Sequence, residues 1–253
     1  MNIDHIKKLL LEVKDILNIE EEIQLKRNST RFQAELSWNE QSRNWIVYYE
    51  QSLKKFVLSH ELGHIYYAKQ WINFNDFAIP PPFNIRAERD FFLLVNNLLD
   101  CFVNHSLSKF SKLYTFYKEE LFSYYLDNLD DFCLHIEKHS DKTKVLSWFF
   151  LFYIDFKYII KEKDANSRRE DIKRLLDKLK ERILQILNND NTTLDLIIER
   201  LDRFNDVKET RDPRLVIHYF VNLLLASNIW DKEQIMTQIK IFFPNCVNLI
   251  KKK

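Results

Sequence analysis

Apolar side chains recur at helical spacing at the start of the chain, and three short strand-like runs follow. Between residues 3 and 19 the apolar positions fall three or four apart, which predicts an amphipathic helix; they are Ile3, Ile6, Leu9, Leu10, Val13, Ile16 and Leu17. The run at 32–38 alternates in polarity, and the runs at 23–27 and 45–50 contain β-branched or aromatic residues, which predicts strands. Because a polar turn at 39–44 separates the last two runs, we expect a small antiparallel sheet.

Helical spacing dominates from residue 55 onward. Residues 55–68 and 85–107 predict two helices, separated by a loop that contains Pro80-Pro81-Pro82 and cannot be helical. Further helices are predicted at 113–127, 129–139, 143–162, 166–188, 192–204, 211–227 and 231–242. The pattern therefore predicts an α+β protein, in which the sheet packs on helix 55–68 and a mainly helical second half follows. We divide the chain into 1–107 and an all-helical part, 108–253.

One helix carries a candidate metal site. Within 55–68 the chain reads His60-Glu61-Leu62-Gly63-His64. Two histidines at i and i+4 lie on the same face of a helix, so both imidazoles can bind one metal ion. Glu61 points about a quarter-turn away, where it is well placed to contact a water on that ion. This H-E-x-x-H spacing predicts a zinc site with Glu61 as general base.

The neighbours of this motif indicate that its helix is buried. Val57, Leu58, Leu62, Ile65 and Tyr66 surround the two histidines with apolar side chains. Gly63 is the only glycine in the 253 residues, and in mid-helix it costs about 1 kcal/mol relative to alanine. We therefore expect another part of the backbone to approach this helix closely at Gly63.

The third metal ligand is expected on helix 85–107. From residue 91 to 103 that helix is apolar nearly all round, yet Asn96, Asp100 and Asn104 recur at i, i+4 and i+8. A buried carboxylate needs a cation or hydrogen-bond donors, and a metal held by the two histidines is such a cation. We predict Asp100 as the ligand and Asn96 and Asn104 as its supports. Glu88, on the same line of the helix, and Asn96 are the alternative ligands.

The two motifs resemble those of the zincin metallopeptidases, and more narrowly their gluzincin-like branch. In that branch the second helix carries a glutamate ligand and, four residues later, an aspartate; the matching positions here are Asn96 and Asp100. A closer likeness is to metallopeptidases whose second helix reads N-x-x-x-D-x-x-x-N, found here as 96–104. The lead-in 56–60 is similar to peptidases that cleave bacterial repressors, whose third ligand falls nearer Glu88. The resemblance covers about residues 20–107.

Together these features predict a peptidase with one Zn²⁺ per chain and a peptide or protein substrate. Glu61 would take a proton from the attacking water and pass it to the leaving amine. We expect strand 45–50 to offer its edge to an extended peptide by main-chain pairing. The alternative is a zinc-stabilised scaffold or binding protein, with weak or absent catalysis, since the usual glutamate ligand is missing.

Composition narrows the possible partners. Apolar residues make up 46% and charged residues 30%, which indicates a folded globular chain. The net charge is +1, from 38 basic and 37 acidic side chains, so no strong field attracts nucleic acid or a membrane. The longest apolar run, 145–154, is too short to cross a bilayer, and the N-terminus lacks the apolar stretch of a secretory signal. Three widely spaced cysteines read as reduced thiols, so we expect a cytoplasmic protein.

The remaining histidines carry weaker signals. His135 and His139 are also four apart, but the glutamate between them is at i+2, and we interpret them as surface residues. His105 is interpreted as a helix cap, and Cys101, beside Asp100, as a small buried residue. His218 and Tyr219 have the chemistry to contact an oxyanion, but only their residue types support that role.

Overall fold

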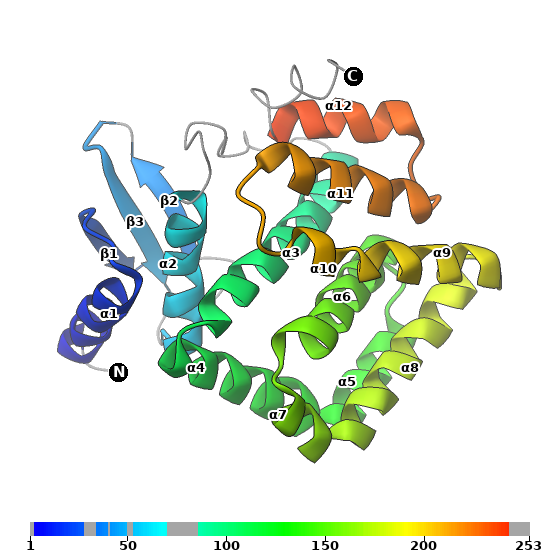
Figure 1. The fold of residues 1–253 in the computed structure, drawn as a ribbon, viewed down its shortest axis with the longest axis horizontal. Coiled ribbons are helices and arrows are strands. Elements are labelled where there is room, and N and C mark those ends of the chain that lie inside the picture. The colour runs from blue at the N-terminus through cyan, green and yellow to red at the C-terminus, as the bar shows by residue number, and fades with distance from the viewer. Residues whose placement is uncertain (1–2, 28–33, 40, 50–52, 70–85, 243–253) are drawn as a thin grey trace.

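The chain folds as a small sheet followed by many helices, which is the α+β class predicted (Figure 1). A computed structural model describes residues 3–27, 34–39, 41–49, 53–69 and 86–242. The first part consists of α1 (Ile3–Leu17), β1 (Ile23–Arg27), β2 (Ala34–Asn39), β3 (Asn44–Tyr49), α2 (Lys55–Lys69) and α3 (Arg86–Ser108). The helices and π-helical turns that follow are α4 (Ser111–Leu121), η2 (Phe122–Leu126), α5 (Leu129–Lys138), α6 (Lys142–Ile154), η3 (Asp155–Ile159), α7 (Glu162–Ser167), α8 (Arg169–Ile186), α9 (Asn191–Asp202), α10 (Phe204–Val207), α11 (Pro213–Ala226) and α12 (Lys232–Phe242).

The sheet is mixed, so the expectation of a wholly antiparallel sheet is wrong. Its strand order is β1-β3-β2, with β1 parallel to β3 and β2 antiparallel to β3. The central strand, β3, is the one with the most continuous apolar run, and most of its residues are buried on both faces of the sheet. A strand of that composition is most stable where neighbours cover both of its edges. The order of the strands in the sheet therefore follows their burial and not their sequence along the chain.

This topology changes which strand can accept a peptide. Because β3 is paired on both sides, the prediction that strand 45–50 offers its edge is wrong; Glu50 lies outside the described residues. Within the described ranges β2 pairs with one strand only, so its second edge is unpaired, and β2 packs against α2. The edge beside the histidine helix thus belongs to β2.

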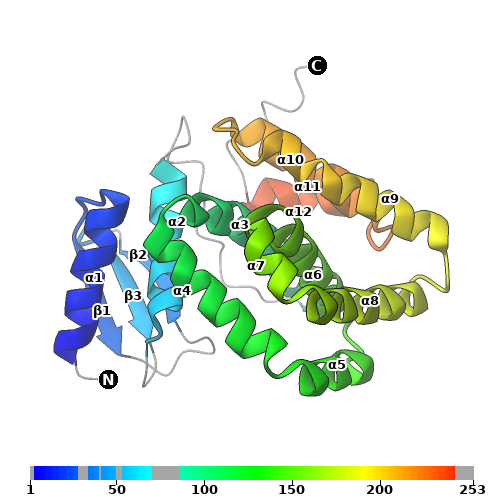
Figure 2. The same cartoon turned by 60° about the horizontal axis from the view of Figure 1, so that its bottom comes forward.

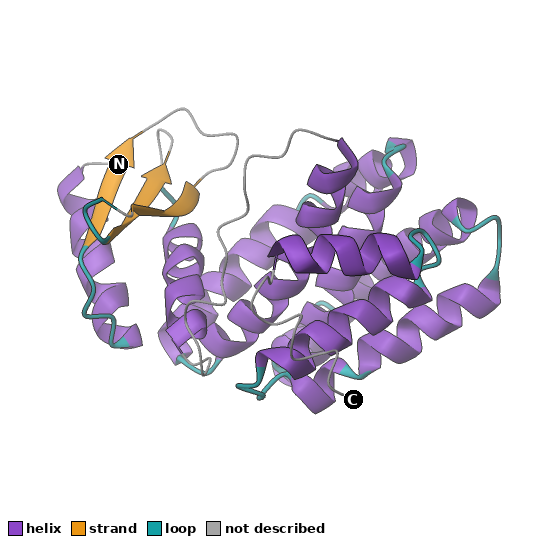
Figure 3. Ribbon diagram, turned by 90° about the horizontal axis from the view of Figure 1, so that it is seen from above, coloured by secondary structure: helices purple, strands orange, loops and turns teal. Residues whose placement is uncertain are grey.

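Helices α1 and α2 lie on one face of the sheet (Figure 3). Leu25, Leu36 and Val47 are aligned across the three strands, so their side chains share one face. All three belong to the apolar core or pack against it, and α1 packs against α2. The sheet therefore supports α2 from one side.

Gly63 brings α2 and α3 close together. A Cβ at this position would lie 2.7 Å from Cγ1 of Val103 and 3.0 Å from Cδ1 of Leu107, both on α3. The first distance is shorter than real carbon–carbon contacts, so a methyl group has no room unless α3 shifts. A neighbouring helix does approach closely at Gly63, but the atoms that fill the space belong to side chains of α3 and not to the backbone that was expected.

Helix α3 joins the two parts of the chain. It packs on α2 and α4 on one side and on α6 and η3 on the other. Figure 2 shows the sheet and α1 at one end of the molecule and α8 and α9 at the other, with α3 between them. The apolar run 145–154 lies in α6, where most of its side chains are buried. Residues of the helical half therefore reach the helix that carries Asp100.

Among the described residues, no helix has the length and apolar character needed to cross a membrane. Cys101 and Cys133 are free thiols and are buried. Cys246 and the proline-containing loop 71–84 lie outside the described residues.

Candidate metal centre

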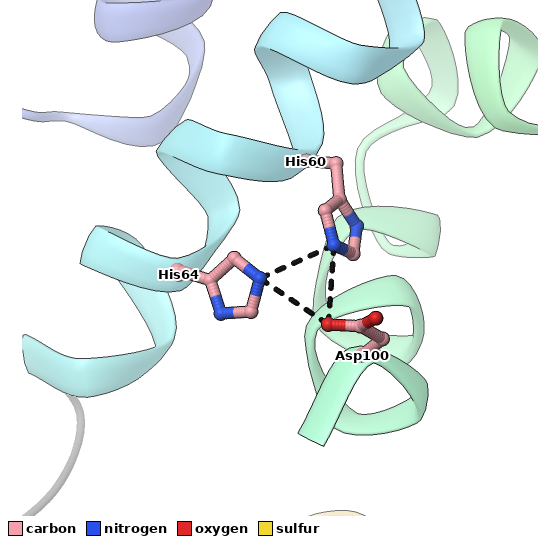
Figure 4. Close-up of side chains that lie close together, drawn as sticks. All are labelled: His60, His64 and Asp100. Atoms are coloured by element: carbon pink, nitrogen blue, oxygen red, sulfur yellow. Dashed lines mark hydrogen bonds and ion pairs between the residues drawn. The ribbon is translucent and has the colours of Figure 1, made fainter. Parts of the chain in front are cut away.

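Three side chains from α2 and α3 point their ligand atoms at a common centre (Figure 4). Nε2 of His60 lies 3.2 Å from Nε2 of His64, and each nitrogen lies 3.3 Å from Oδ1 of Asp100. The edge of a tetrahedron around an ion with bonds of roughly 2.0–2.1 Å is about 3.3–3.4 Å. The three atoms thus already have the mutual spacing of ligands on one tetrahedral ion. This His60–His64–Asp100 group can hold a metal ion.

The local sequence explains why these groups converge. His60 and His64 are one turn apart on α2, and Leu58, Leu62 and Ile65, on its other faces, are fully buried. The two imidazoles therefore face α3 with side-chain exposures of 15% and 23%. Asp100, 16% exposed, meets them from α3. The site is enclosed but still reached by solvent.

The predicted polar stripe on α3 lies beside this group. Asn96 Nδ2 donates to Oδ2 of Asp100 at 3.3 Å, and Oδ1 of Asn104 lies 3.0 Å from Nδ1 of His60. An amide oxygen accepts only, so His60 carries its proton on Nδ1 and leaves the Nε2 lone pair for a cation. Asn96 and Asn104 thus contact Asp100 and His60, which are the positions expected of supporting residues. Asn96, one alternative ligand, meets Asp100 rather than either histidine.

Glu88, the other alternative ligand, lies in the first turn of α3. Its side chain lies outside the described residues. Its backbone precedes Asp100 by twelve residues, which corresponds to about 18 Å along a helix axis. An ion held by His60, His64 and Asp100 would therefore lie far from the start of α3.

The carboxylate and the imidazoles shift one another's pKa. Burial alone would lower the pKa of His60, but the charge and hydrogen bond of Asp100 outweigh it and raise that pKa to about 9. Burial would raise the pKa of Asp100, but the charges and hydrogen bonds of His60 and His64 hold it well below its usual range. In the absence of a metal ion, protonated His60 is therefore the positive charge that stabilises the Asp100 carboxylate.

Glu61 lies against both the histidines and the edge of the sheet. Burial raises its pKa above the usual value, while the charges of His64 and His60 oppose that rise. The backbone N–H of Leu36, on β2, faces the Glu61 carboxylate and also opposes that rise. A glutamate with a raised pKa next to a metal site has the properties of a general base.

Metal affinity is expected to rise with pH between 7 and 9. In the metal-free protein His60 carries a second proton, on Nε2, up to a pKa of about 9. That second proton must leave before Nε2 can bind a metal. Lower pH thus favours the metal-free form, and the apparent affinity should increase about tenfold per pH unit until it levels off above pH 9. Competition with a chromophoric chelator of known pH dependence measures it. An affinity that stays flat from pH 7 to 9 contradicts the assignment of His60 as a ligand.

The other histidines lie elsewhere. His135 of α5 and His139, directly after its end, contact Trp148 with tilted or edge-on rings, at centroid distances of 5.4 and 5.2 Å. Within the described residues no carboxylate completes a metal group with them. His135 is exposed, as predicted for a surface residue. His218 contacts Asn222, and the Tyr219 hydroxyl donates to the backbone oxygen of Leu201, so neither meets the His60–His64–Asp100 group.

His105 and Cys101 are both buried. Nε2 of His105 lies 2.7 Å from Oε1 of Glu209, so His105 joins α3 to the segment before α11 and is not the helix cap predicted. The reason is that its side chain faces the helical half and not the last carbonyls of α3. Cys101 donates to the backbone oxygen of Asn97, in line with its interpretation as a small buried residue.

Two groups near the site were not predicted from the sequence. One is the Leu36 N–H, whose direction depends on strand pairing. The other is Asp155, a buried carboxylate of η3 that faces Asn104. A single acidic residue inside the apolar stretch Ile154-Asp155-Phe156 was the only available signal for the latter. Comparison of the chain with protein families, curated proteins and solved structures finds no match, so the site is characterised by its geometry alone.

Proposed function

We propose that the chain is a zinc-dependent metallopeptidase, with one zinc ion held by His60, His64 and Asp100. The main support is the spacing of 3.2–3.3 Å among their three ligand atoms, which fits a tetrahedral ion. Two imidazoles and one carboxylate leave a fourth position open to solvent. When bound there, zinc lowers the pKa of a water to around 7 and polarises a substrate carbonyl.

Glu61 would handle the protons of the reaction. It follows His60 in the chain, and its raised pKa brings its proton affinity closer to that needed near neutral pH. In this proposal Glu61 takes the proton of the attacking water and delivers it to the nitrogen of the leaving amine. The Leu36 N–H keeps the carboxylate in place between the sheet and the histidines.

The substrate would bind along the unpaired edge of β2. In an antiparallel pair, alternate residues turn their N–H and C=O groups outward. The Leu36 N–H points to Glu61 and away from β3, so Ala34 and Trp38, two residues on either side, also face outward. An extended peptide added to this edge would run beside α2 and bring a scissile carbonyl to the metal group.

Metal analysis and a chelator-controlled digest test the proposal. Purified protein should contain about one zinc per chain, and it should cleave members of a broad peptide library. Removing zinc with a chelator is expected to abolish cleavage, and adding zinc back should restore it. Mass spectrometry of the digest reports the cleavage sites.

The second histidine pair offers a matched control. His60→Ala should lose both zinc and cleavage, whereas His135→Ala and His139→Ala, also four residues apart but at the end of α5, should lose neither. A protein that purifies and refolds without any bound zinc contradicts the proposal. One zinc per chain without cleavage of any peptide would instead favour the zinc-stabilised binding protein.

A further inference from the structure

Asp155 is a buried carboxylate that the proposed mechanism does not use. It is 1% exposed, and its Oδ1 has no hydrogen-bond partner among the described residues. Asp155 begins η3. There the backbone N–H of Ile160 donates to the backbone oxygen of Asp155, five residues earlier, at 2.8 Å. Such π turns are rare in proteins as a whole, and those that occur are often found at functional sites. The chain therefore keeps an ionisable group in its apolar interior, which is unfavourable unless something nearby needs its charge.

The groups that face Asp155 connect it to the metal group. Burial raises the pKa of Asp155 to about 7, and the nearby Tyr117 hydroxyl and Asn104 side-chain amide oppose this rise. Asn104, 4% exposed, has its Oδ1 3.0 Å from Nδ1 of His60. One small side chain thus bridges the buried carboxylate and a candidate ligand.

The chemistry of an amide fixes the direction of this bridge. An ionised carboxylate accepts hydrogen bonds only, so the Asn104 Nδ2 group must face Asp155. The amide oxygen then points the other way, to His60, and accepts the Nδ1 proton. That arrangement keeps the His60 ring in place with the Nε2 lone pair directed at the centre of the three ligands.

We propose that Asp155 is a positioning residue of the metal centre, which acts through Asn104 on His60. This inference rests on the proposed metal site. The helical half of the chain therefore contributes a part of the site that residues 1–107 alone lack.

Asp155→Asn is expected to weaken zinc binding about 10- to 100-fold at pH 8, measured by competition with a chelator. Asparagine has the same shape but no charge, and its own amide no longer dictates the direction of the Asn104 amide. The metal-free fold should respond differently. Since the folded chain holds Asp155 at a raised pKa, its ionisation disfavours folding progressively from about pH 4 to 7, and above pH 7 removal of the charge should leave the unfolding temperature unchanged or higher.

Asp202 provides the matched control in the same half. Its carboxylate accepts from Lys157, Tyr153 and Tyr158, whereas the hydrogen bond of Asn104 in the described residues is with His60. Asp202→Asn should lower the unfolding temperature and leave zinc affinity within about twofold of the wild type. A structural role for Asp155 predicts this same behaviour for Asp155→Asn, so the two variants separate positioning from stability.

A double-mutant cycle tests whether Asp155 acts through Asn104. In an Asn104→Ala background, Asp155→Asn should change zinc affinity by less than about twofold, because the bridge is already gone. Additive losses overturn the relay, as does an Asp155→Asn variant with wild-type affinity.

A metal-free measurement keeps this inference separate from the proposed function. In protein labelled with ¹⁵N-histidine, the His60 Nδ1–H held by Asn104 should be protected from exchange and visible by NMR. The signal should disappear in Asn104→Ala and in Asp155→Asn. If the wild-type protein binds no zinc but the signal still disappears in both variants, the relay is retained and the peptidase is rejected. If the signal persists in Asp155→Asn, the relay alone is rejected.

Discussion

Glu61→Gln is expected to lower peptide hydrolysis by about 10²–10⁴-fold while zinc stays bound. Glutamine has nearly the same size and can still accept the Leu36 N–H through its amide oxygen, so the site keeps its shape. An amide cannot take a proton from the attacking water, and that step is the one lost. Initial rates on the best cleaved peptide measure the loss of hydrolysis, and the zinc content per chain shows whether the metal is retained.

The pH profile gives Glu61 a second readout. A general base works only when it is unprotonated, so the wild-type rate should fall as the pH drops through the raised pKa of Glu61. The residual rate of Glu61→Gln should not decrease over that pH range, because the variant has no carboxylate at position 61 to protonate. Glu119→Gln, at an exposed position on α4, is the matched control and should behave as the wild type. Full activity in Glu61→Gln with zinc retained would assign the base to another group.

The features predicted correctly from the sequence are those that local spacing controls. Two histidines four residues apart share a helix face wherever that helix lies, so their convergence needed no knowledge of the fold. The stripe of Asn96, Asp100 and Asn104 was visible for the same reason, since it interrupts an otherwise apolar helix. The helices predicted at 129–139, 192–204 and 231–242 agree with α5, α9 and α12 to within two residues at each end.

The features that were missed depend on contacts between distant segments. A polar turn between two strands indicates a hairpin, and β2 and β3 do pair, but nothing local indicates that β1 joins the far side of β3 in parallel. The unpaired edge follows from that pairing and was therefore assigned to the wrong strand. The short helices α7 and α10, of 6 and 4 residues, carry too few positions for a periodic pattern.

Asp155 illustrates the same limit at the site. It lies 51 positions beyond Asn104, at the end of an apolar run that predicts only a buried helix. The packing of η3 on α3 brings it to Asn104, and the π turn that begins at this residue has no periodic signature. The sequence therefore predicted that His60, His64 and Asp100 meet and that two asparagines lie beside them, since all five share two helices. It did not predict the carboxylate that comes from the second half.

Asp100→Ala is expected to weaken zinc binding by at least about 10²-fold, more than the loss of a supporting residue. The substitution removes one of three ligand atoms and the only carboxylate within the described His60–His64–Asp100 group. It also removes the group that raises the pKa of His60, so burial should bring that pKa below its present value of about 9. Zinc binding at pH 7 should then release fewer protons than in the wild type, which calorimetry in buffers of different ionisation enthalpy measures.

Two further variants give this prediction its contrast. Asp100→Asn keeps the shape of the side chain and one oxygen ligand but loses the charge, so its zinc affinity should fall between those of the wild type and Asp100→Ala. Glu88→Ala should bind zinc as the wild type does, because its backbone lies about 18 Å further along α3. A reversed order, with Glu88→Ala weak and Asp100→Ala unchanged, would move the third ligand to the start of α3. In that case the spacing of 3.3 Å between Asp100 and each histidine would reflect an ion pair and not a metal site.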